Sequence, residues 1–156
     1  IGCGAGANLY RIYKQFRGAE VGGIDINADA IKIAKQNCPF AKDLEVGTAH
    51  SIFFSDKSID IIISDAVLIY LTPFKINKTI KEMARVARNG VIFCELWHPS
   101  IWQRILLWTK EGYYAHPYSR LLKKYGFYDI KITKIPKKLW PDSLWVKYGY
   151  IVSAKI

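Results

Sequence analysis

The chain has 156 residues, 51% hydrophobic and 23% charged, which suits one folded domain and excludes a disordered or fibrous polypeptide. Its longest apolar stretch, residues 59–71, is interrupted by Asp60 and Asp65, whereas a membrane-spanning helix needs about 20 apolar residues, so no membrane partner is expected. The net charge of +10 permits contact with nucleic acid, acidic lipid headgroups or anionic small molecules, although the basic residues are spread along the chain and could equally form a solvated lysine-rich surface.

The three cysteines, Cys3, Cys38 and Cys94, are scattered and show no CxxC spacing. Neither a disulfide framework nor a zinc site is therefore predicted, and we expect no bound metal. Reduced thiols are typical of cytoplasmic proteins, so a cytoplasmic location is expected.

The first half of the chain alternates between helical and strand patterns. A glycine-rich opening leads into a helix with an apolar face at Leu9, Ile12, Tyr13 and Phe16. Residues 20–26 are predicted to form a buried strand. A helix capped by Asn27 follows, with Ile31, Ala34 and Cys38 facing inward, and then a short strand at residues 44–46.

The second half continues this alternation and ends differently. Residues 59–64 form a β-branched run, as expected for a strand covered on both faces. Thr72-Pro73 predicts a helix start, with a buried stripe running to Ala87 and an end at Asn89-Gly90. A strand at 91–96, an irregular aromatic-rich segment at 97–118 and a helix at 119–125 follow. Two final strands, 127–135 and 145–154, predict an antiparallel hairpin at one sheet edge.

The opening motif is a glycine loop, Gly2-Cys3-Gly4-Ala5-Gly6, placed where a strand should lead into a helix. Glycines there let the backbone approach a ligand, and a helix N-terminus offers free N–H groups. Asp25 lies 19 residues after Gly6 and suits a carboxylate that holds ribose hydroxyls. These features alone also fit a dinucleotide-binding protein, a simple tight turn, or a helix-capping role for Asp25.

The chain as a whole resembles the class I S-adenosylmethionine-dependent methyltransferases, in particular the type 11-like branch. The segments that carry this resemblance are IGCGAGAN, VGGIDINADAIKIAKQN, SIDIIISDAVLIYLTP, KEMARVARNGVIFCEL and LLKKYGF with the terminal hairpin. They follow the family's order across essentially all of residues 1–156, which are therefore expected to form one methyltransferase domain. The resemblance implies an α/β, Rossmann-like, doubly wound and mostly parallel sheet.

The resemblance also implies S-adenosylmethionine as cofactor and assigns residues to it. The glycine loop would lie under the methionine and ribose parts, Asp25 would hold the ribose hydroxyls, and Ile26 would pack on the adenine. Thr48 and Ala49 stand where the family usually has an acidic residue near the adenine amino group. The residues expected to line the methionine end are Ser64, Asp65 and Ala66, although Asp65 could also be a solvated carboxylate.

The predicted reaction moves a methyl group to an oxygen or nitrogen of a small molecule, with a base that helps to deprotonate the acceptor. The candidates for that base are His98, His116 and Tyr114, and Tyr70 is a further one. The +10 charge leaves an RNA or DNA methyltransferase open, but no Asn-Pro-Pro-Tyr or Asp-Pro-Pro-Tyr motif is present, so this alternative is not favoured. A nonenzymatic methyltransferase-like binding protein is the other alternative, and the oligomeric state is not predicted.

The resemblance further implies a strand before the glycine loop, ending in an acidic residue. The chain begins at Ile1, inside the motif, which leaves no room for that strand. We therefore expect residues 1–156 to be a fragment whose first, central strand lies upstream.

Overall fold

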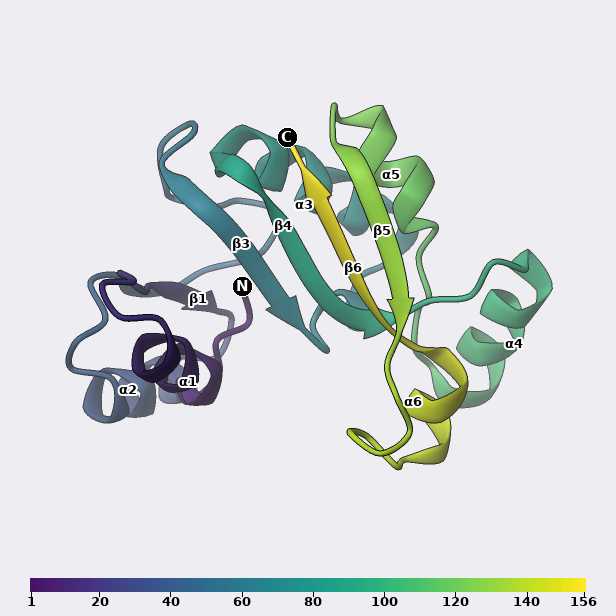
Figure 1. Cartoon of the computed structure of the whole chain (residues 1–156), viewed down its shortest axis with the longest axis horizontal. Helices are drawn as coiled ribbons and strands as arrows, with labels where there is room; N and C mark the ends of the chain where they lie inside the picture. Colours follow the sequence, from purple (N-terminus) through teal and green to yellow (C-terminus); the bar gives the residue numbers. More distant parts are fainter. The chain divides into compact units, whose positions relative to one another are not determined.

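The computed structural model describes residues 1–156, which divide into two compact units, 1–53 and 54–156 (Figure 1). The first unit contains α1 (Ala7–Gln15), β1 (Gly23–Asp25), α2 (Ala28–Asn37) and β2 (Leu44–Val46). Strands β1 and β2 pair in parallel, with Ile24 opposite Glu45. This arrangement is the β-α-β unit that the alternation of patterns predicts.

The core of the first unit is small and is formed mainly by α1, α2 and β2. Its buried members are Leu9, Val21, Ile31, Ala34, Cys38 and Leu44. The side chain of Asn27 accepts hydrogen bonds from the backbone N–H groups of Asp29 (2.9 Å) and Ala30 (3.2 Å), which confirms the predicted cap of α2.

Two predictions for this unit need correction. The predicted strand at residues 20–26 is limited to Gly23–Asp25, because its partner strand offers only Leu44–Val46 for pairing. The apolar face of α1 is mostly uncovered: Leu9 is buried, whereas Phe16 is 59% exposed and lies beyond the end of the helix in extended backbone. Tyr13 stacks on Phe40, with ring centroids 3.9 Å apart.

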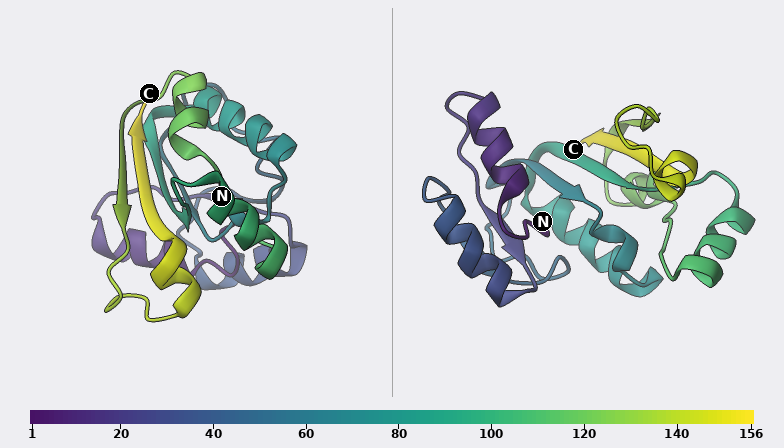
Figure 2. Two further views of the ribbon diagram at one scale, coloured as in Figure 1. Left: turned by 90° about the vertical axis from the view of Figure 1, so that its right-hand side faces the viewer. Right: turned by 90° about the horizontal axis from the view of Figure 1, so that it is seen from below.

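The second unit is built on one mixed sheet. Its elements are β3 (Ile59–Asp65), the 3-10 turn η1 (Leu68–Tyr70), α3 (Pro73–Val86), β4 (Ala87–Leu96), α4 (Ile101–Glu111), α5 (Tyr118–Lys124), β5 (Tyr128–Lys134), α6 (Ser143–Tyr148) and β6 (Gly149–Lys155). The strand order is β3-β4-β6-β5, with β3 parallel to β4 and β6 antiparallel to both of its neighbours. The predicted terminal hairpin is thus confirmed, and helices α3 and α5 lie on the same side of the sheet (Figure 2).

Helix α3 begins where the sequence predicts and ends earlier. Thr72 Oγ1 accepts a hydrogen bond from the backbone N–H of Lys75 (3.4 Å), and Pro73 occupies the first turn. The helix ends at Val86 rather than at Asn89-Gly90, because Ala87 already has extended backbone and starts β4. Gly90 belongs to the strand, where a Cβ atom would collide with the backbone carbonyl of Ala154 in β6.

Three further expectations for the second unit are wrong. The aromatic-rich segment contains a regular helix, α4, and residues 145–148 belong to α6 rather than to the last strand. Asp142 caps α6 by accepting hydrogen bonds from Leu144 N (2.9 Å) and Trp145 N (3.2 Å). Strand β3 is also not covered on both faces, since Ile62 is buried while Ile61 is 43% exposed. None of the helices has both the length and the apolar character needed to cross a membrane.

Candidate cofactor site and surrounding residues

The glycine loop wraps around the carboxyl end of β1. The backbone N–H groups of Gly2 and Cys3 both donate to the carbonyl of Ile24, at 2.8 and 3.1 Å. Gly2, Gly4 and Gly6 all have positive φ, at 66°, 52° and 93°, a conformation that glycine adopts without steric cost. The loop then passes directly into the first turn of α1, so its backbone N–H groups gather at one helix N-terminus.

Gly6 is also required by its close neighbours. A Cβ atom there would lie 2.7 Å from the sulfur of Cys38, which donates a hydrogen bond to the Gly6 carbonyl at 3.4 Å. The loop is therefore held against α2 as well as against β1.

Asp25 connects the parts of the loop. Its Oδ2 accepts a hydrogen bond from Gly4 N (2.8 Å), and its Oδ1 accepts one from Asn27 N (2.9 Å). Its backbone carbonyl accepts a further bond from Gly47 N (2.9 Å), which brings the end of β2 to the same edge. Since each carboxylate oxygen has two lone pairs, both retain acceptor capacity for a hydroxyl group.

The other predicted cofactor residues of the first unit lie at this edge. Ile26 is 77% exposed directly after β1, as a residue that covers a bound ring would be. Thr48 is half-buried and its carbonyl accepts a hydrogen bond from Ser51 N (3.1 Å), while Ala49 is buried. The structure therefore brings together the glycine loop, Asp25, Ile26 and the residues that follow β2.

Of the three predicted residues of the second unit, Ser64 and Asp65 are the last two residues of β3, and Ala66 follows the strand directly. Ser64 is 1% exposed and its hydroxyl donates to Glu95 Oε1 at 3.0 Å. Ala66 has a positive φ of 54° and its N–H donates to the carbonyl of Cys94 at 2.9 Å. Burial, followed by the negative charge of Asp65, raises the pKa of the Cys94 thiol to about 12.

Glu95 is a residue of this region that sequence reasoning missed. It is fully buried in β4, and its carboxylate accepts hydrogen bonds from three successive backbone N–H groups: those of Val67 and Leu68 at 3.0 Å and that of Ile69 at 3.3 Å. Burial raises its pKa to about 7, against the opposing effect of these bonds. Glu95 thereby holds the backbone of η1 in place, and its signal in the sequence is a single acidic residue within the apolar run 91–96.

His116 and Tyr114 both bond to the backbone of η1. The Nε2–H of His116 donates to the carbonyl of Leu68 at 3.0 Å, and Tyr114 N donates to that of Ile69 at 2.8 Å. The Tyr114 ring is roughly parallel to that of His116, with centroids 5.8 Å apart. His116 is 3% exposed, and burial lowers its pKa to about 4, so it is a neutral, buried hydrogen-bond donor at pH 7.

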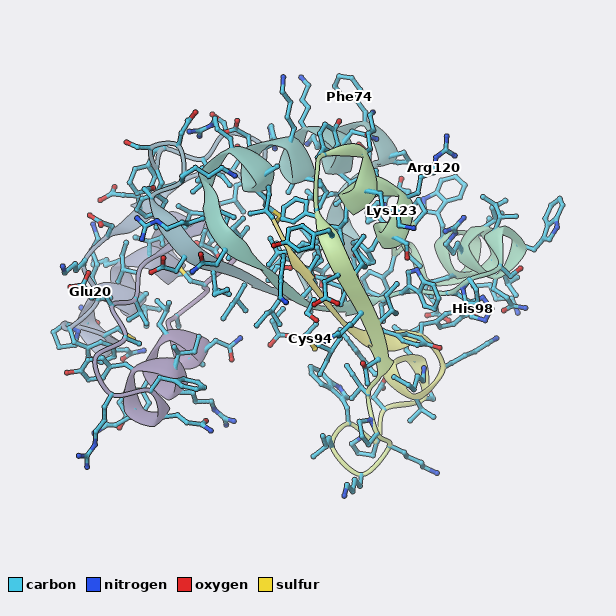
Figure 3. All side chains as sticks on the ribbon, turned by 45° about the horizontal axis from the view of Figure 1, so that its top comes forward. Glu20, Phe74, Cys94, His98, Arg120 and Lys123 are labelled. Carbon is cyan, nitrogen blue, oxygen red and sulfur yellow. The ribbon has the colours of Figure 1, made fainter.

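His98 is the more accessible of the two predicted histidines. It is half-buried before the start of α4 (Figure 3), and its Nδ1 accepts a hydrogen bond from Ser100 N at 3.1 Å. The neutral ring therefore carries its proton on Nε2. Its ring lies edge-on to Tyr148, with centroids 5.8 Å apart.

Neither unit contains three His, Cys, Asp or Glu side chains grouped as metal ligands. The groups present at the edge of the first unit are backbone N–H groups, a helix N-terminus and the carboxylate of Asp25. Those groups suit a ligand with hydroxyl groups.

Comparison with known proteins identifies the family. The sequence model of a family described as "Methyltransferase domain" matches residues 1–90, which include the glycine loop, Asp25 and the whole of β3. The chain belongs to this methyltransferase domain family, and the resemblance inferred from the sequence is confirmed.

Two curated proteins are related over part of their length. The chain is 31% identical over 87 residues to the biotin biosynthesis bifunctional protein BioHC of Cellvibrio japonicus, a match that covers 56% of this chain and 17% of that protein. It is 32% identical over 102 residues to the uncharacterized methyltransferase sll0829 of Synechocystis sp., covering 64% of this chain and 47% of that protein. The matched region thus spans less than half the length of either relative.

Solved structures show the same fold. The PH0226 protein from Pyrococcus horikoshii aligns with a TM-score of 0.72 at 20% identity, covering 99% of this chain and 78% of that one. Geranyl diphosphate C-methyltransferase from Streptomyces coelicolor, solved with Mg²⁺, geranyl diphosphate and S-adenosyl-L-homocysteine, aligns at 0.74 and 14% identity, covering 99% and 70%. A Haemonchus contortus phosphoethanolamine N-methyltransferase, solved with phosphomonomethylethanolamine and S-adenosylhomocysteine, aligns at 0.75 and 16%, covering 100% and 48%. The predicted Rossmann-like α/β fold class is thereby confirmed.

Proposed function

We propose that the protein transfers a methyl group from S-adenosylmethionine to an oxygen or nitrogen atom of a small molecule, and that residues 1–156 belong to one methyltransferase domain. The family membership and the cofactor compounds in the related solved structures support this proposal. The observation that carries it is the glycine loop tied to Asp25 at the carboxyl end of β1.

The residues of this edge fit the proposed cofactor. Asp25 keeps acceptor capacity on both carboxylate oxygens, which suits the two ribose hydroxyls. The glycine loop presents backbone without side chains, and Ile26 offers an exposed apolar surface for an adenine ring. When bound, the cofactor supplies a methyl group already activated on a sulfonium, so the protein has mainly to orient the acceptor and exclude water.

The acceptor is proposed to be a small molecule because the named substrates of the related solved enzymes are small molecules. Nucleic acid is the less favoured acceptor. A cytoplasmic location, inferred from the cysteine usage, likewise stays a prediction.

Catalytic roles for His98, His116 and Tyr114 also stay predictions. His116 is occupied as a donor to Leu68, and the Nδ1 of His98 is occupied as an acceptor from Ser100. A true base should contribute about 10²-fold or more to turnover and little to cofactor affinity. Comparing turnover of His98→Gln and His116→Gln with their affinity for S-adenosylhomocysteine separates a base from a structural histidine.

The proposed cofactor site is tested by calorimetry with S-adenosylhomocysteine on the Asp25→Ala variant. Losing charge-assisted hydrogen bonds to the ligand should weaken binding by about 10- to 150-fold. Asp43→Ala is the matched control, because Asp43 is exposed and precedes β2, at the opposite edge of the same two-stranded sheet. Equal affinity of the folded Asp25 and Asp43 variants would exclude Asp25 from the site.

A further inference from the structure

Helix α4 exposes an apolar face. Five large apolar side chains of this helix are between 37% and 76% exposed: Ile101, Trp102, Ile105, Leu106 and Trp108. At about 100° per residue these side chains share one continuous arc of roughly 160° around the helix. Groups of exposed apolar side chains of this kind mark interaction surfaces, whereas single ones are ordinary.

The opposite face of α4 is the one held by the protein, and it is partly polar. Leu107 is 1% exposed in the apolar cluster that also contains Leu96 and Trp145. Gln103 Oε1 accepts a hydrogen bond from the hydroxyl of Tyr148 at 3.0 Å, and Arg104 is half-buried. The inner face of α4 therefore buries Leu107 beside two partly buried polar side chains, whereas both tryptophans of the helix point outward.

One basic side chain of α4 borders this face, and two more lie in a loop of the same unit. Lys110 borders the apolar arc, and the loop between β5 and α6 exposes Lys137, Lys138 and Leu139, the last at 68%. Trp140 of the same loop packs against the apolar cluster that contains Leu107. The loop and the inner face of α4 therefore contact the same part of the core.

The charge decides which partner suits the apolar face. A second copy of the chain would bring two molecules of net charge +10 together, whereas an anionic surface would attract each of them. Exposed Trp side chains with neighbouring lysines are typical of helices that lie in the headgroup region of a bilayer. We propose that the outer face of α4 docks the protein on an anionic lipid surface.

This docking needs no membrane-spanning segment. An 11-residue helix is about 16 Å long, too short to cross a bilayer but long enough to lie on it. The expectation of no membrane partner rested on the lack of a long apolar stretch, and that lack excludes a spanning helix but not a helix that lies on the surface. The proposal is also independent of the cofactor site in the first unit.

The test measures binding of the purified protein to vesicles of equal parts phosphatidylglycerol and phosphatidylcholine, and to vesicles of phosphatidylcholine alone. Trp102→Ser and Ile105→Ser should each lower the partition coefficient on the anionic vesicles by about tenfold. Phe74→Ser is the matched control, since Phe74 is 70% exposed on α3, away from α4 (Figure 3), and it should bind like the wild type. Phosphatidylcholine vesicles should bind the wild type much more weakly.

Circular dichroism of each variant confirms that it is folded, which is expected because the substituted side chains are exposed. Unchanged vesicle binding by both α4 variants would overturn the proposal. So would loss of binding by the Phe74 variant to the same extent, which would indicate unspecific adhesion. Failure of the wild type to bind, together with dimers that Trp102→Ser dissociates in analytical ultracentrifugation, would assign the face to a second copy instead.

Discussion

Glu95→Gln provides a quantitative test of how the second unit is stabilised. The carboxylate is fully buried, and burial raises its pKa from 4.5 to about 7, although three backbone N–H groups and the Ser64 hydroxyl donate to it. At about 1.4 kcal/mol per pH unit, this difference corresponds to about 3 kcal/mol between the two protonation states. Gln has nearly the same shape but does not titrate.

Proton linkage gives the direction in which the free energy of unfolding changes with pH. Because the pKa of Glu95 is higher in the folded than in the unfolded protein, the folded state binds more protons between pH 4.5 and about 7. The contribution of Glu95 to stability is therefore fully present below pH 4.5 and is lost as the pH rises through about 7. The free energy of unfolding of the wild type, minus that of Glu95→Gln, should fall by about 3 kcal/mol across this range.

Urea unfolding of both proteins, below pH 4.5 and above pH 7, measures this difference. The buried His116 titrates with the opposite sign, but it is present in both proteins and its contribution cancels in the difference. A difference independent of pH, or one that increases with pH, would mean that the pKa of Glu95 is not raised in the fold. It would show that the four donors outweigh burial and keep the carboxylate ionised in the fold.

Two further predictions concern single side chains. For His116, whose pKa is lowered from 6.5 to about 4, the contribution to stability is present above pH 6.5 and is lost as the pH falls through about 4. The free energy of unfolding of the wild type minus that of His116→Gln should thus rise with pH in urea titrations, and a flat difference would show that burial does not lower the pKa of the ring. Gly6→Ala should lower the free energy of unfolding by about 1–3 kcal/mol in thermal unfolding, because the new Cβ combines a positive φ with a clash against Cys38. Gly18→Ala should cost less, because Gly18 has a positive φ but open space around it. Equal costs for the two glycine variants would contradict the close packing of the loop on α2.

Features with local causes were predictable from the sequence. Asn27 and Thr72-Pro73 cap their helices through hydrogen bonds and backbone geometry that involve only the next few residues. The glycine loop and Asp25 were found for the same reason, because spacing along the chain places them at the end of one strand. The terminal hairpin followed from two successive strand patterns with no helix pattern recognised between them.

Features that depend on distant contacts were not predictable. Glu95 accepts a hydrogen bond from Ile69, 26 positions away, and His116 donates one to Leu68, 48 positions away. No local sequence pattern encodes contacts of this kind. Helix α4 was missed because its outward side chains are apolar, which hides the usual contrast between a buried and a solvated face. The α6 helix was missed because its apolar residues also fit a strand, and only the cap at Asp142 distinguishes the two.

Thermal unfolding with and without S-adenosylhomocysteine tests whether the protein binds an S-adenosyl cofactor. At a ligand concentration a hundredfold above the dissociation constant, binding should stabilise the fold by about 2.7 kcal/mol and raise the melting temperature. NAD at the same concentration should leave the melting curve unchanged. If NAD raises the melting temperature and saturating S-adenosylhomocysteine does not, the site binds a dinucleotide and not an S-adenosyl compound.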